Sequence, residues 1–336
     1  ILTTAWIEIM QHQFARALTF MKQAELIIDD RILDREVLGE IAFFRGYVMY
    51  FDGQAEGSLR NLEEAVQLLS DKKTPFLAEA ELMLGLARCM VGQKDLAIGA
   101  LKAKASETGI SENYLLSRLI AGLSFIYLIC GDLVSVRVEA KRLLLVSKEH
   151  NMLLTKAWSY HFLACSHLHS GELEAALLHF TQTVDLRYML EPRAAVDAMA
   201  GLALTQQLMG LKDDATESWR KLQIFATELN EENYLAAARS CHARLSVFRG
   251  EIKSAVEWSR SVSESPVPAE LFSWLEAPSI TQARVLIAGG SEDDQVRALQ
   301  LLRAIRKQCE VASFIGQTIE VSILQSHALD KLGRAD

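Results

Sequence analysis

The stretch Ala164-Cys165-Ser166-His167-Leu168-His169-Ser170-Gly171-Glu172-Leu173-Glu174-Ala175-Ala176-Leu177-Leu178-His179-Phe180 contains the local pattern on which the rest of this sequence is built. One apolar stretch with helical spacing ends at Gly171, and a second begins directly after it. A glycine at such a point lets the chain leave one helix through a left-handed conformation before it enters the next. The pattern therefore predicts two antiparallel helices joined by a tight turn.

The same turn recurs along the chain with a regular period. The glycines that end apolar helical stretches are spaced 39 or 40 residues apart, and Gly333 follows the last of them after 43: Gly53, Gly92, Gly131, Gly171, Gly210, Gly250 and Gly290. A repeat of this length is typical of helical solenoids, although the tetratricopeptide repeat is shorter, at about 34 residues. We predict an all-α, tetratricopeptide-like, right-handed superhelical solenoid of about eight helix-turn-helix repeats.

Small residues occupy a second column, seven positions before each glycine and therefore on the same helix face. They allow the two helices of a repeat to approach closely: Gly46, Gly85, Ser124, Ala164, Ala203, Ala243, Ala283 and, before Gly333, Ser326. Nine positions after the glycines the residue is large in most repeats, with Ala140 and Ser259 as exceptions: Leu62, Leu101, Phe180, Trp219 and Leu299. The alternation of small and large residues predicts how each helix pair packs.

We interpret the whole chain as one solenoid over residues 1–336. Its repeats are expected near 1–30, 35–70, 76–106, 112–149, 152–188, 192–229, 232–263 and 270–308, with a partial repeat at 312–336. The stretch from Ser263 to Pro278 holds three of the five prolines and is expected to be an irregular connection. Neither end carries the polar cap that a solenoid needs, so we expect a fragment of a longer chain.

Composition excludes several classes of function. The net charge is −8, and basic residues are interleaved with acidic ones, as at Lys212-Asp213-Asp214, so we expect no direct contact with nucleic acid. No signal peptide and no apolar run long enough to cross a bilayer occur, which favours a cytoplasmic protein without membrane contact. The five cysteines are far apart and odd in number, so we interpret them as small buried apolar residues in a reducing compartment.

The amino-acid sequences of several repeats resemble those of one family. Gly39-Glu40-Ile41-Ala42, Gly131-Asp132-Leu133, Gly171-Glu172-Leu173-Glu174-Ala175-Ala176 and, above all, Pro268-Ala269-Glu270-Leu271-Phe272-Ser273-Trp274-Leu275-Glu276-Ala277-Pro278 with Thr281-Gln282-Ala283-Arg284-Val285-Leu286 are similar to the large, ATP-dependent LuxR-type transcription regulators of the MalT-like group. The resemblance covers essentially the whole chain, but only the central helical region of that family. The repeat columns are shared by many tetratricopeptide proteins, whereas the stretch after Trp274 is more specific.

This resemblance implies a place within a three-part protein. In the family, a nucleotide-switch ATPase precedes the helical repeats and a helix-turn-helix domain that binds DNA follows them. The repeat region receives a small-molecule inducer or a regulatory protein and couples it to ATP-driven self-association. The expected partners are therefore an inducer or regulatory protein and the ATPase and DNA-binding domains of the same full-length protein. The chain itself has no phosphate-binding loop, because Gly53-Gln54-Ala55-Glu56-Gly57-Ser58 has the wrong spacing and no lysine, so no cofactor is expected in this segment.

The tetratricopeptide register also predicts which residues line a concave, ligand-binding groove. The first helix of each repeat lines that side in such solenoids, and aromatic rings beside isolated charges suit a partly apolar ligand or a peptide. The candidate residues are Glu40, Phe43, Tyr47, Tyr50, Glu79, Arg118, Phe125, Trp158, His161, Asp197, Gln207 and Arg244, and the same register adds apolar positions such as Leu128, Leu168 and Leu204. For any single aromatic residue, burial between repeats is the competing interpretation.

Two further kinds of site receive less support from the sequence. His161 and Cys165 lie four residues apart on one helix face, a spacing that a transition metal can bridge, but two more ligands are missing and a structural role is favoured. No nucleophile elbow and no paired acid and base occur, so we expect no catalytic residues and no enzyme activity. The alternative to a LuxR-type sensor region is a stand-alone tetratricopeptide adaptor that holds a peptide segment of a partner protein.

Overall fold

The computed structural model describes residues 1–10, 13–27, 35–70, 74–108, 112–262, 272, 274–289 and 291–334. The regular structure in these residues is helical, without strands, and this confirms the predicted all-α solenoid of helix pairs. The helices are α1 (Leu2–Met10), α2 (Phe14–Ile27), α3 (Arg35–Phe51), α4 (Ala55–Leu69), α5 (Pro75–Met90), α6 (Lys94–Glu107), α7 (Asn113–Ile129), α8 (Leu133–Glu149), α9 (Leu153–His169), α10 (Leu173–Asp185), the short 3₁₀ helix η2 (Arg187–Met189), α11 (Pro192–Leu208), α12 (Lys212–Leu229), α13 (Glu232–Arg249), α14 (Ile252–Ser261), α15 (Pro278–Gly289), α16 (Glu292–Val311) and α17 (Ile315–Lys331).

The turns between paired helices lie where the glycine register predicts them. The glycines of this register that the structure describes have positive φ angles, between 67° and 81°: Gly53, Gly92, Gly131, Gly171, Gly210, Gly250 and Gly333. This backbone conformation is unfavourable for residues with a Cβ atom, which explains the choice of glycine. Gly290 lies outside the described residues. Between successive pairs, Asn151 and Asn230 take the same left-handed conformation, each with φ of 53°.

The small residues before the turns lie where paired helices meet. A Cβ atom added at Gly46 of α3 would stand 2.6 Å from Cγ of Leu62 in α4, and one added at Gly85 of α5 would stand 2.8 Å from Cδ1 of Leu101 in α6. Leu62 and Leu101 are the large residues of the predicted column. The other small residues of the column are fully or almost fully buried, except for the exposed Ser326: Ser124, Ala164, Ala203, Ala243 and Ala283. The small-and-large packing pattern is thereby confirmed.

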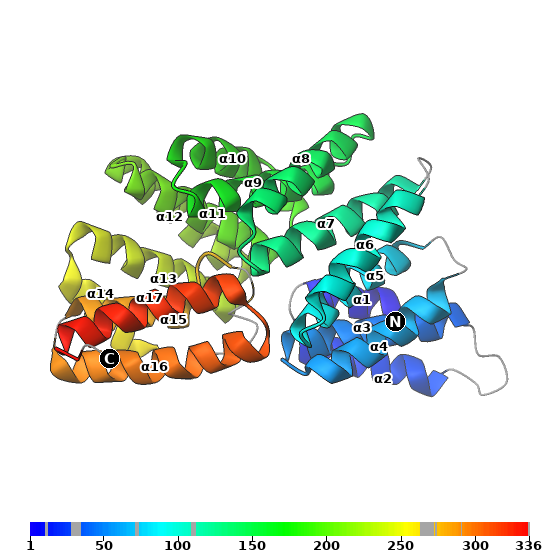
Figure 1. The fold of residues 1–336 in the computed structure, drawn as a ribbon, viewed down its shortest axis with the longest axis horizontal. Helices are drawn as coiled ribbons and strands as arrows, with labels where there is room; N and C mark the ends of the chain where they lie inside the picture. Colours follow the sequence, from blue (N-terminus) through cyan, green and yellow to red (C-terminus); the bar gives the residue numbers. More distant parts are fainter. Residues whose placement is uncertain are drawn as a thin grey trace. The chain divides into compact units, whose positions relative to one another are not determined.

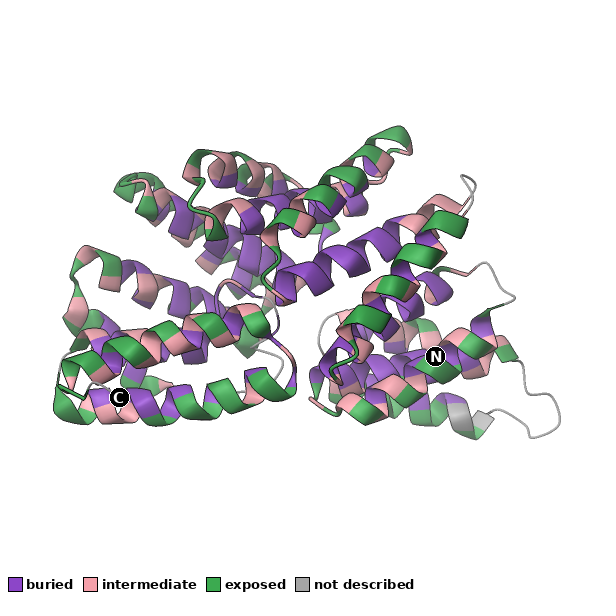
Figure 2. Cartoon of the chain, viewed as in Figure 1, coloured by how far each residue is buried: buried purple, intermediate pink, exposed green. Residues whose placement is uncertain are grey.

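The first helix of a pair is buried on more sides than the second. In α11 buried residues occur around most of the helix, whereas α12 buries a narrow stripe made of Ala215, Leu222, Phe225 and Ala226. Figure 2 shows the same contrast between the largely buried α7 and α11 and the mixed surfaces of α8 and α16. A helix that is apolar on one stripe alone covers a core from one side, whereas the first helices pack against elements on several sides.

The contacts divide the chain into two compact units. The first comprises Ile1–Tyr127 and Val138–Ser159, and the second comprises Leu128–Arg137 and Tyr160–Asp336. The first unit contains α1 to α6, and the second contains α10 to α17, so the dividing points fall within α7, α8 and α9. In the second unit, α13 to α17 pack in sequence order, and α13 also contacts α15 directly (Figure 1). Each unit is described below by itself.

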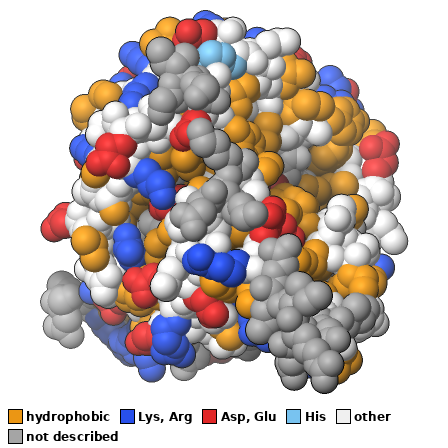
Figure 3. Space-filling view, turned by 90° about the vertical axis from the view of Figure 1, so that its right-hand side faces the viewer, with side chains coloured by type: hydrophobic (Ala, Val, Ile, Leu, Met, Phe, Trp, Pro, Cys, Tyr) orange, Lys and Arg blue, Asp and Glu red, His pale blue; other side chains and the backbone are white. Residues whose placement is uncertain are grey.

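The surface and the cysteines agree with the sequence pattern. On the face drawn in Figure 3, Lys and Arg side chains lie beside Asp and Glu side chains, with hydrophobic side chains between them. Across the described residues, no helix combines the length and the apolar character that crossing a membrane requires. No disulfide joins any of the five cysteines, all of which are among the described residues. Cys130 is partly exposed and the others are buried: Cys89, Cys165, Cys241 and Cys309.

Candidate functional site

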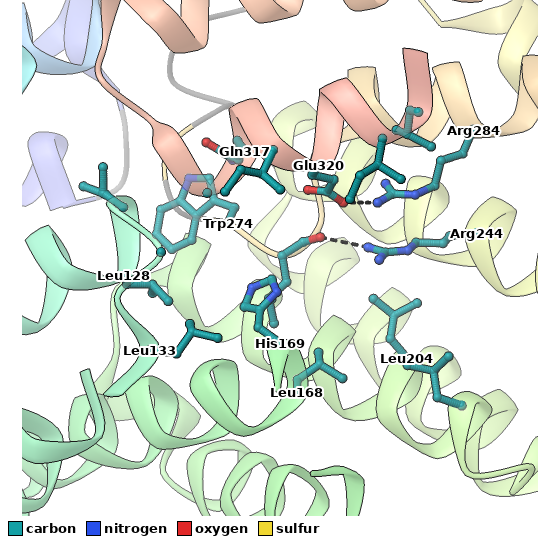
Figure 4. Close-up of a pocket in the computed structure, with 18 of the residues that line it drawn as sticks. Leu128, Leu133, Leu168, His169, Leu204, Arg244, Trp274, Arg284, Gln317 and Glu320 are labelled. Atoms are coloured by element: carbon teal, nitrogen blue, oxygen red, sulfur yellow. Dashed lines mark hydrogen bonds and ion pairs between the residues drawn. The ribbon is translucent and has the colours of Figure 1, made fainter. Parts of the chain in front are cut away.

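A cavity of about 610 Å³ lies within the second unit (Figure 4). This volume falls in the range of about 300–1,000 Å³ that is usual for small-molecule sites. Residues from the ends of α7, α9 and α11 line it, together with the start of α8, parts of α13, α15 and α17, and the non-helical segment before α15. All of these residues belong to the second unit.

Most of the cavity wall is apolar. Leucine side chains and one indole ring form it, and in Figure 4 they surround the open space: Leu128, Leu133, Leu168, Leu204 and Trp274. On the side of α17, Ile319 and Ile323 complete this wall and are about half exposed, at 55% and 53%. Removing such surfaces from water on ligand binding is favourable, so the cavity suits a ligand with an apolar body.

Two arginines and a glutamate form the charged part of the wall. Arg284 of α15 makes an ion pair with Glu320 of α17, and the side chains of the two residues are 18% and 31% exposed. Burial of Arg284, and then the positive charge of Arg244, lower the pKa of Arg284 to about 9. A guanidinium with this pKa stays protonated at neutral pH, so both arginines bring positive charge to the cavity.

Arg244 of α13 is held in place from behind the wall. Its Nη1 donates to the carbonyl oxygen of Leu275 at 2.9 Å and to Oε2 of Glu276 at 3.3 Å. Its Nε is buried and has no hydrogen-bond partner among the described residues. A guanidinium carries five N–H donors, so the contacts made within the protein leave donor capacity for a ligand.

His169, at the end of α9, points into the cavity between the leucines and Arg244 (Figure 4). The surrounding wall, which displaces water, lowers the pKa of His169, and the positive charge of Arg244 lowers it further. The pKa of this ring starts from a reference value of about 6.5, so the lowered value leaves His169 neutral at neutral pH. Its ring then offers one donor and one acceptor rather than a third positive charge.

The non-helical segment that carries Trp274 and Leu275 is fixed by a buried polar network. The carboxylate of Asp197 in α11 accepts the backbone N–H groups of Leu275 at 3.2 Å and Glu276 at 3.1 Å. Arg193, one helical turn earlier, donates from Nη2 to the carbonyl oxygen of Glu276 at 2.7 Å. Its guanidinium also lies 4.7 Å from the centre of the Trp274 ring. Because the network satisfies the backbone of this segment, Trp274 has a defined place in the wall.

The side chain of Glu276 continues this network into two more helices. Its Oε1 accepts the hydroxyl groups of Ser240 in α13 and Thr281 in α15, the latter at 2.6 Å. Glu276 is fully buried, so its charge depends on these donors and on Arg244. The network therefore joins α11, α13 and α15 directly behind the cavity.

A buried histidine lies at the far side of the same network. Nε2 of His161 is 3.9 Å from Oδ2 of Asp197 and 3.6 Å from Sγ of Cys165. Burial, and then the positive charge of Arg193, lower the pKa of His161 to about 4, while burial raises the pKa of Asp197. The described residues contain no cluster of three or more His, Cys, Asp and Glu side chains arranged to hold a metal ion.

In the first unit, the predicted groove residues lie in separate groups. Phe43 and Tyr47 pack in an aromatic cluster around Trp6 of α1, with Phe43 5.5 Å and Tyr47 6.1 Å from it between ring centres. Tyr50 is buried beside Phe51, and this burial raises the pKa of the Tyr50 hydroxyl. Glu40 is half-buried.

The charged pair of the first unit is internal as well. Glu79 accepts hydrogen bonds from Arg118 and from the hydroxyl of Tyr114, both at 2.6 Å. Both charged side chains are buried, which makes this pair an inter-helix contact between α5 and α7. Phe125 and Trp158 pack edge to face with their ring centres 4.8 Å apart. These groups place apolar and charged residues together, but in the interior of the unit.

In the second unit, the predicted residues other than Gln207 lie in or behind the cavity wall. Arg244 lines the cavity, as do the apolar register positions Leu128, Leu168 and Leu204. Asp197 and His161 belong to the buried network described above. Gln207, the next-to-last residue of α11, is not part of the cavity lining, and its Oε1 accepts a hydrogen bond from Nε of Arg249 at 2.7 Å.

Sequence analysis missed several residues of the cavity. Arg284 lies six positions before Gly290 and Glu320 thirteen before Gly333, which are the spacings of Arg244 from Gly250 and of Asp197 from Gly210. The glycine register therefore contains a signal for both residues, whereas Gln317 falls outside it. Trp274 belongs to the stretch that carries the family resemblance, and it precedes α15, outside the helices to which the register applies. Its position two residues before Glu276, a lone acidic residue in an apolar stretch, is the signal that marks this segment.

Similar proteins were found among solved structures. The chain is similar to a Rap conjugation gene regulator of the plasmid pLS20 in complex with the Phr* peptide, with 14% identity, a TM-score of 0.55, and coverage of 92% of this chain and 81% of that one. It is also similar to a Rap protein complexed with competence and sporulation factor, with 13% identity, a TM-score of 0.52, and coverage of 99% and 97%. At these identities the likeness concerns the fold.

A search of the curated proteins gave no match. The family comparison is more specific, because the sequence pattern of the MalT-like TPR region matches residues 39–336, which is most of the chain and includes the whole cavity. The chain belongs to the MalT-like TPR region family.

Proposed function

We propose that this chain is the ligand-sensing and protein-interaction repeat region of a LuxR-type, ATP-dependent transcription regulator. The cavity of the second unit is where it receives its signal. The inducer or regulatory segment binds there, and the altered second unit passes the signal to the ATPase and DNA-binding parts of the regulator. Membership of the MalT-like family supports this role, because helical repeats of this type have concave surfaces that suit binding.

The observation that carries the proposal is the combination of an apolar wall with anchored arginines. A cavity that only results from loose packing is usually lined by apolar groups. Here Arg244 is held by Leu275 and the fully buried Glu276, whose charge is positioned at considerable desolvation cost, and Arg284 is held by the partly exposed Glu320. Such an arrangement suits the recognition of a ligand that is apolar at one end and polar at the other.

A thermal-shift screen of the purified chain tests the proposal. The compounds are sugars, aromatic and aliphatic acids, and short peptides, and the hits are then measured by calorimetry. Leu208, which lines the cavity and is 46% exposed, is changed to Trp to obstruct it. The matched control is Leu178→Trp on α10, where the leucine is 55% exposed and outside the cavity lining.

The proposal expects hits whose binding is lost in Leu208→Trp and retained in Leu178→Trp, with both variants folded by circular dichroism. Hits that bind both variants equally would contradict it. The remaining groove prediction, for Glu40, Phe43, Tyr47, Tyr50, Glu79, Arg118, Phe125 and Trp158, stays a prediction and is tested by the same screen on Tyr47→Ala and Trp158→Ala.

A second candidate is a stand-alone adaptor that holds a peptide segment of a partner protein. Two solved structures of similar fold are described as complexes with the Phr* peptide and with competence and sporulation factor, which favours ligands of this kind. Sequencing the gene on both sides distinguishes the candidates. A phosphate-binding loop before Ile1 and a helix-turn-helix after Asp336 support the regulator, and their absence supports the adaptor.

A further inference from the structure

We propose that the cavity binds a ligand with a carboxylate on an apolar body, and that Glu320 is a built-in competitor which the ligand's carboxylate replaces at Arg284. This inference rests on the proposed function and adds the chemical class of the ligand. It follows from the charges around the cavity, from the geometry of the two arginines and from the position of Glu320 on α17.

The charges that face the cavity come from α13, α15 and α17. Arg244 and Arg284 are positive, Glu320 is negative, Gln317 is neutral, and His169 has a lowered pKa and is neutral at neutral pH. Glu276 is fully buried behind the wall and takes hydrogen bonds from Ser240 and Thr281 as well as from Arg244. If Glu320 moves away, the positive charges of the wall exceed its negative ones, and an anion fits there.

Arg244 is positioned to take part in binding that anion. The hydrogen bonds that hold it to Leu275 and Glu276 both leave from Nη1. Within the described part of the chain neither Nη2 nor Nε makes a hydrogen bond, and of these two nitrogens only Nε is closed to solvent. Guanidinium groups bind carboxylates strongly through charged N–H donors, so a ligand carboxylate is the group that matches the open Nη2.

Glu320 already occupies the place of such a carboxylate. It pairs with Arg284 from α17, and its side chain is 31% exposed, more than that of Arg284 at 18%. A partly exposed ion pair contributes little net stability, so its exchange for an equivalent pair with a ligand costs little. The ligand's carboxylate then takes the position of the Glu320 carboxylate, and the Glu320 side chain turns toward water.

The apolar body of the ligand provides the net gain in this exchange. It would lie against the leucines and Trp274, and Ile319 and Ile323 would cover it from the side of α17. Their exposed surfaces leave water when the ligand binds, which favours binding in proportion to the area buried. A small organic acid and the C-terminus of a peptide with an apolar last residue share this chemistry.

Two pairs of probes test the inference by calorimetry on the full chain. The first pair is phenylbutanoate and phenylbutanamide, and the second is a tetrapeptide ending in leucine with a free or an amidated C-terminus. Each amide keeps the apolar body and removes the negative charge. We expect the free acid of at least one pair to bind about tenfold more tightly than its amide, or better, because a charged hydrogen bond is lost in the amide. The pair that shows this difference identifies the source of the carboxylate.

The decisive variant is Glu320→Gln, which removes the competing charge at a partly exposed position. It is expected to raise the affinity for the acid several-fold and to leave the affinity for the amide unchanged. The matched control is Glu310→Gln, which neutralises the exposed partner of Arg306 in α16, outside the cavity, and is expected to change neither affinity. Arg284→Met is expected to lower acid binding at least tenfold, and Arg284→Lys should restore part of it.

Equal binding of acid and amide, no binding of either acid, or an unchanged acid affinity in Glu320→Gln would overturn the inference. These outcomes leave the proposed function testable by itself. Neutral compounds that bind wild type and fail to bind Leu208→Trp would keep the cavity as the receiving site and reject only the carboxylate. A screen without any cavity-dependent ligand would reject both.

Discussion

Arg193 of α11 donates a hydrogen bond from Nη2 to the carbonyl oxygen of Glu276 at 2.7 Å, although the two residues are 83 positions apart. This contact ties the non-helical segment before α15 to a helix two repeats earlier. The same guanidinium lies over the Trp274 ring, so one side chain holds both the backbone of the segment and the indole that lines the cavity. The shape of the candidate site thus depends on a polar contact behind it.

Replacing this arginine is expected to destabilise the second unit strongly. Arg193→Met leaves the carbonyl of Glu276 without a charged donor and the fully buried Asp197 without its ion-pair partner. Removing one member of a buried pair typically costs about 3–5 kcal/mol. Urea denaturation followed by circular dichroism measures the loss, with Arg220→Met, a 66% exposed arginine of α12, as the control. A similar small effect for both variants would contradict this role of the network.

The packing of helix pairs predicts opposite effects for two glycine substitutions in the first unit. Gly46→Ala places a Cβ 2.6 Å from Cγ of Leu62, whereas a Cβ at Gly99 in α6 meets nothing within 4 Å. Both alanines gain about 0.5–1 kcal/mol of helix stability, but only the first overfills a contact, at a cost of about 1–3 kcal/mol. We expect Gly99→Ala to raise the melting temperature and Gly46→Ala to lower it. A stabilised Gly46→Ala would mean that α3 and α4 are less closely packed than the structure shows.

The buried His161 makes stability depend on pH. Its pKa is lowered from 6.5 to about 4 in the folded protein, so between these values the unfolded chain binds a proton that the folded chain does not. Above about pH 6.5 the neutral His161 makes its full contribution to the free energy of unfolding. As the pH falls toward 4, this free energy decreases by about 3 kcal/mol in total. The raised pKa of Asp197 acts in the opposite sense, because the folded state then binds the proton more readily.

Comparison of wild type with His161→Leu isolates this contribution. The free energy of unfolding, taken from denaturation curves between pH 7 and pH 4, should decrease less steeply with falling pH for His161→Leu than for wild type. Asp197 is retained in both proteins, so its effect is the same in each. The exposed His327 supplies the control, since His327→Gln removes a histidine that is open to solvent. If the free energy of unfolding depended on pH in the same way for wild type and His161→Leu, the folded and unfolded chains would bind a proton at His161 equally, which would contradict the lowered pKa.

The cysteines are expected to differ in reactivity. Cys130 is partly exposed, whereas Cys165 and Cys241 are fully buried and burial raises their thiol pKa, which disfavours the reactive thiolate. Iodoacetamide at pH 8 should label Cys130 in the native protein and all five cysteines after denaturation, as read by mass spectrometry. In Cys130→Ser, native labelling should disappear. Rapid native labelling of Cys165 would contradict the tight packing around His161.

The turns and the packing of helix pairs could be predicted from sequence because their physical causes are local. A left-handed turn strongly favours glycine, so Gly53 or Gly171 marks the end of a helix whatever the rest of the chain does. The small residue seven positions earlier and the large residue nine positions later, such as Gly46 and Leu62, meet within one hairpin. Their spacing in sequence therefore determines their contact in space.

The site could be predicted only in part, since its residues meet through the packing of distant helices. The register placed Arg244 and Leu204 on the inner side of their helices, where the cavity lies. Counting positions from the turn glycines cannot distinguish an aromatic ring that faces a groove from one that packs against another helix, as Phe43 does against Trp6. The pairing of Arg284 with Glu320 joins helices α15 and α17, and no local pattern in the sequence indicates it.

Amide hydrogen exchange with and without the tightest hit of the screen tests most directly where the ligand binds. If the cavity of the second unit is the receiving site, exchange slows at Trp274–Ala277 and in the last turn of α11 near Leu204 and Leu208, and α3 is unaffected. Slower exchange confined to α3 around Phe43 and Tyr47, with no change at Trp274–Ala277, would contradict the account and would place the site among the groove residues of the first unit.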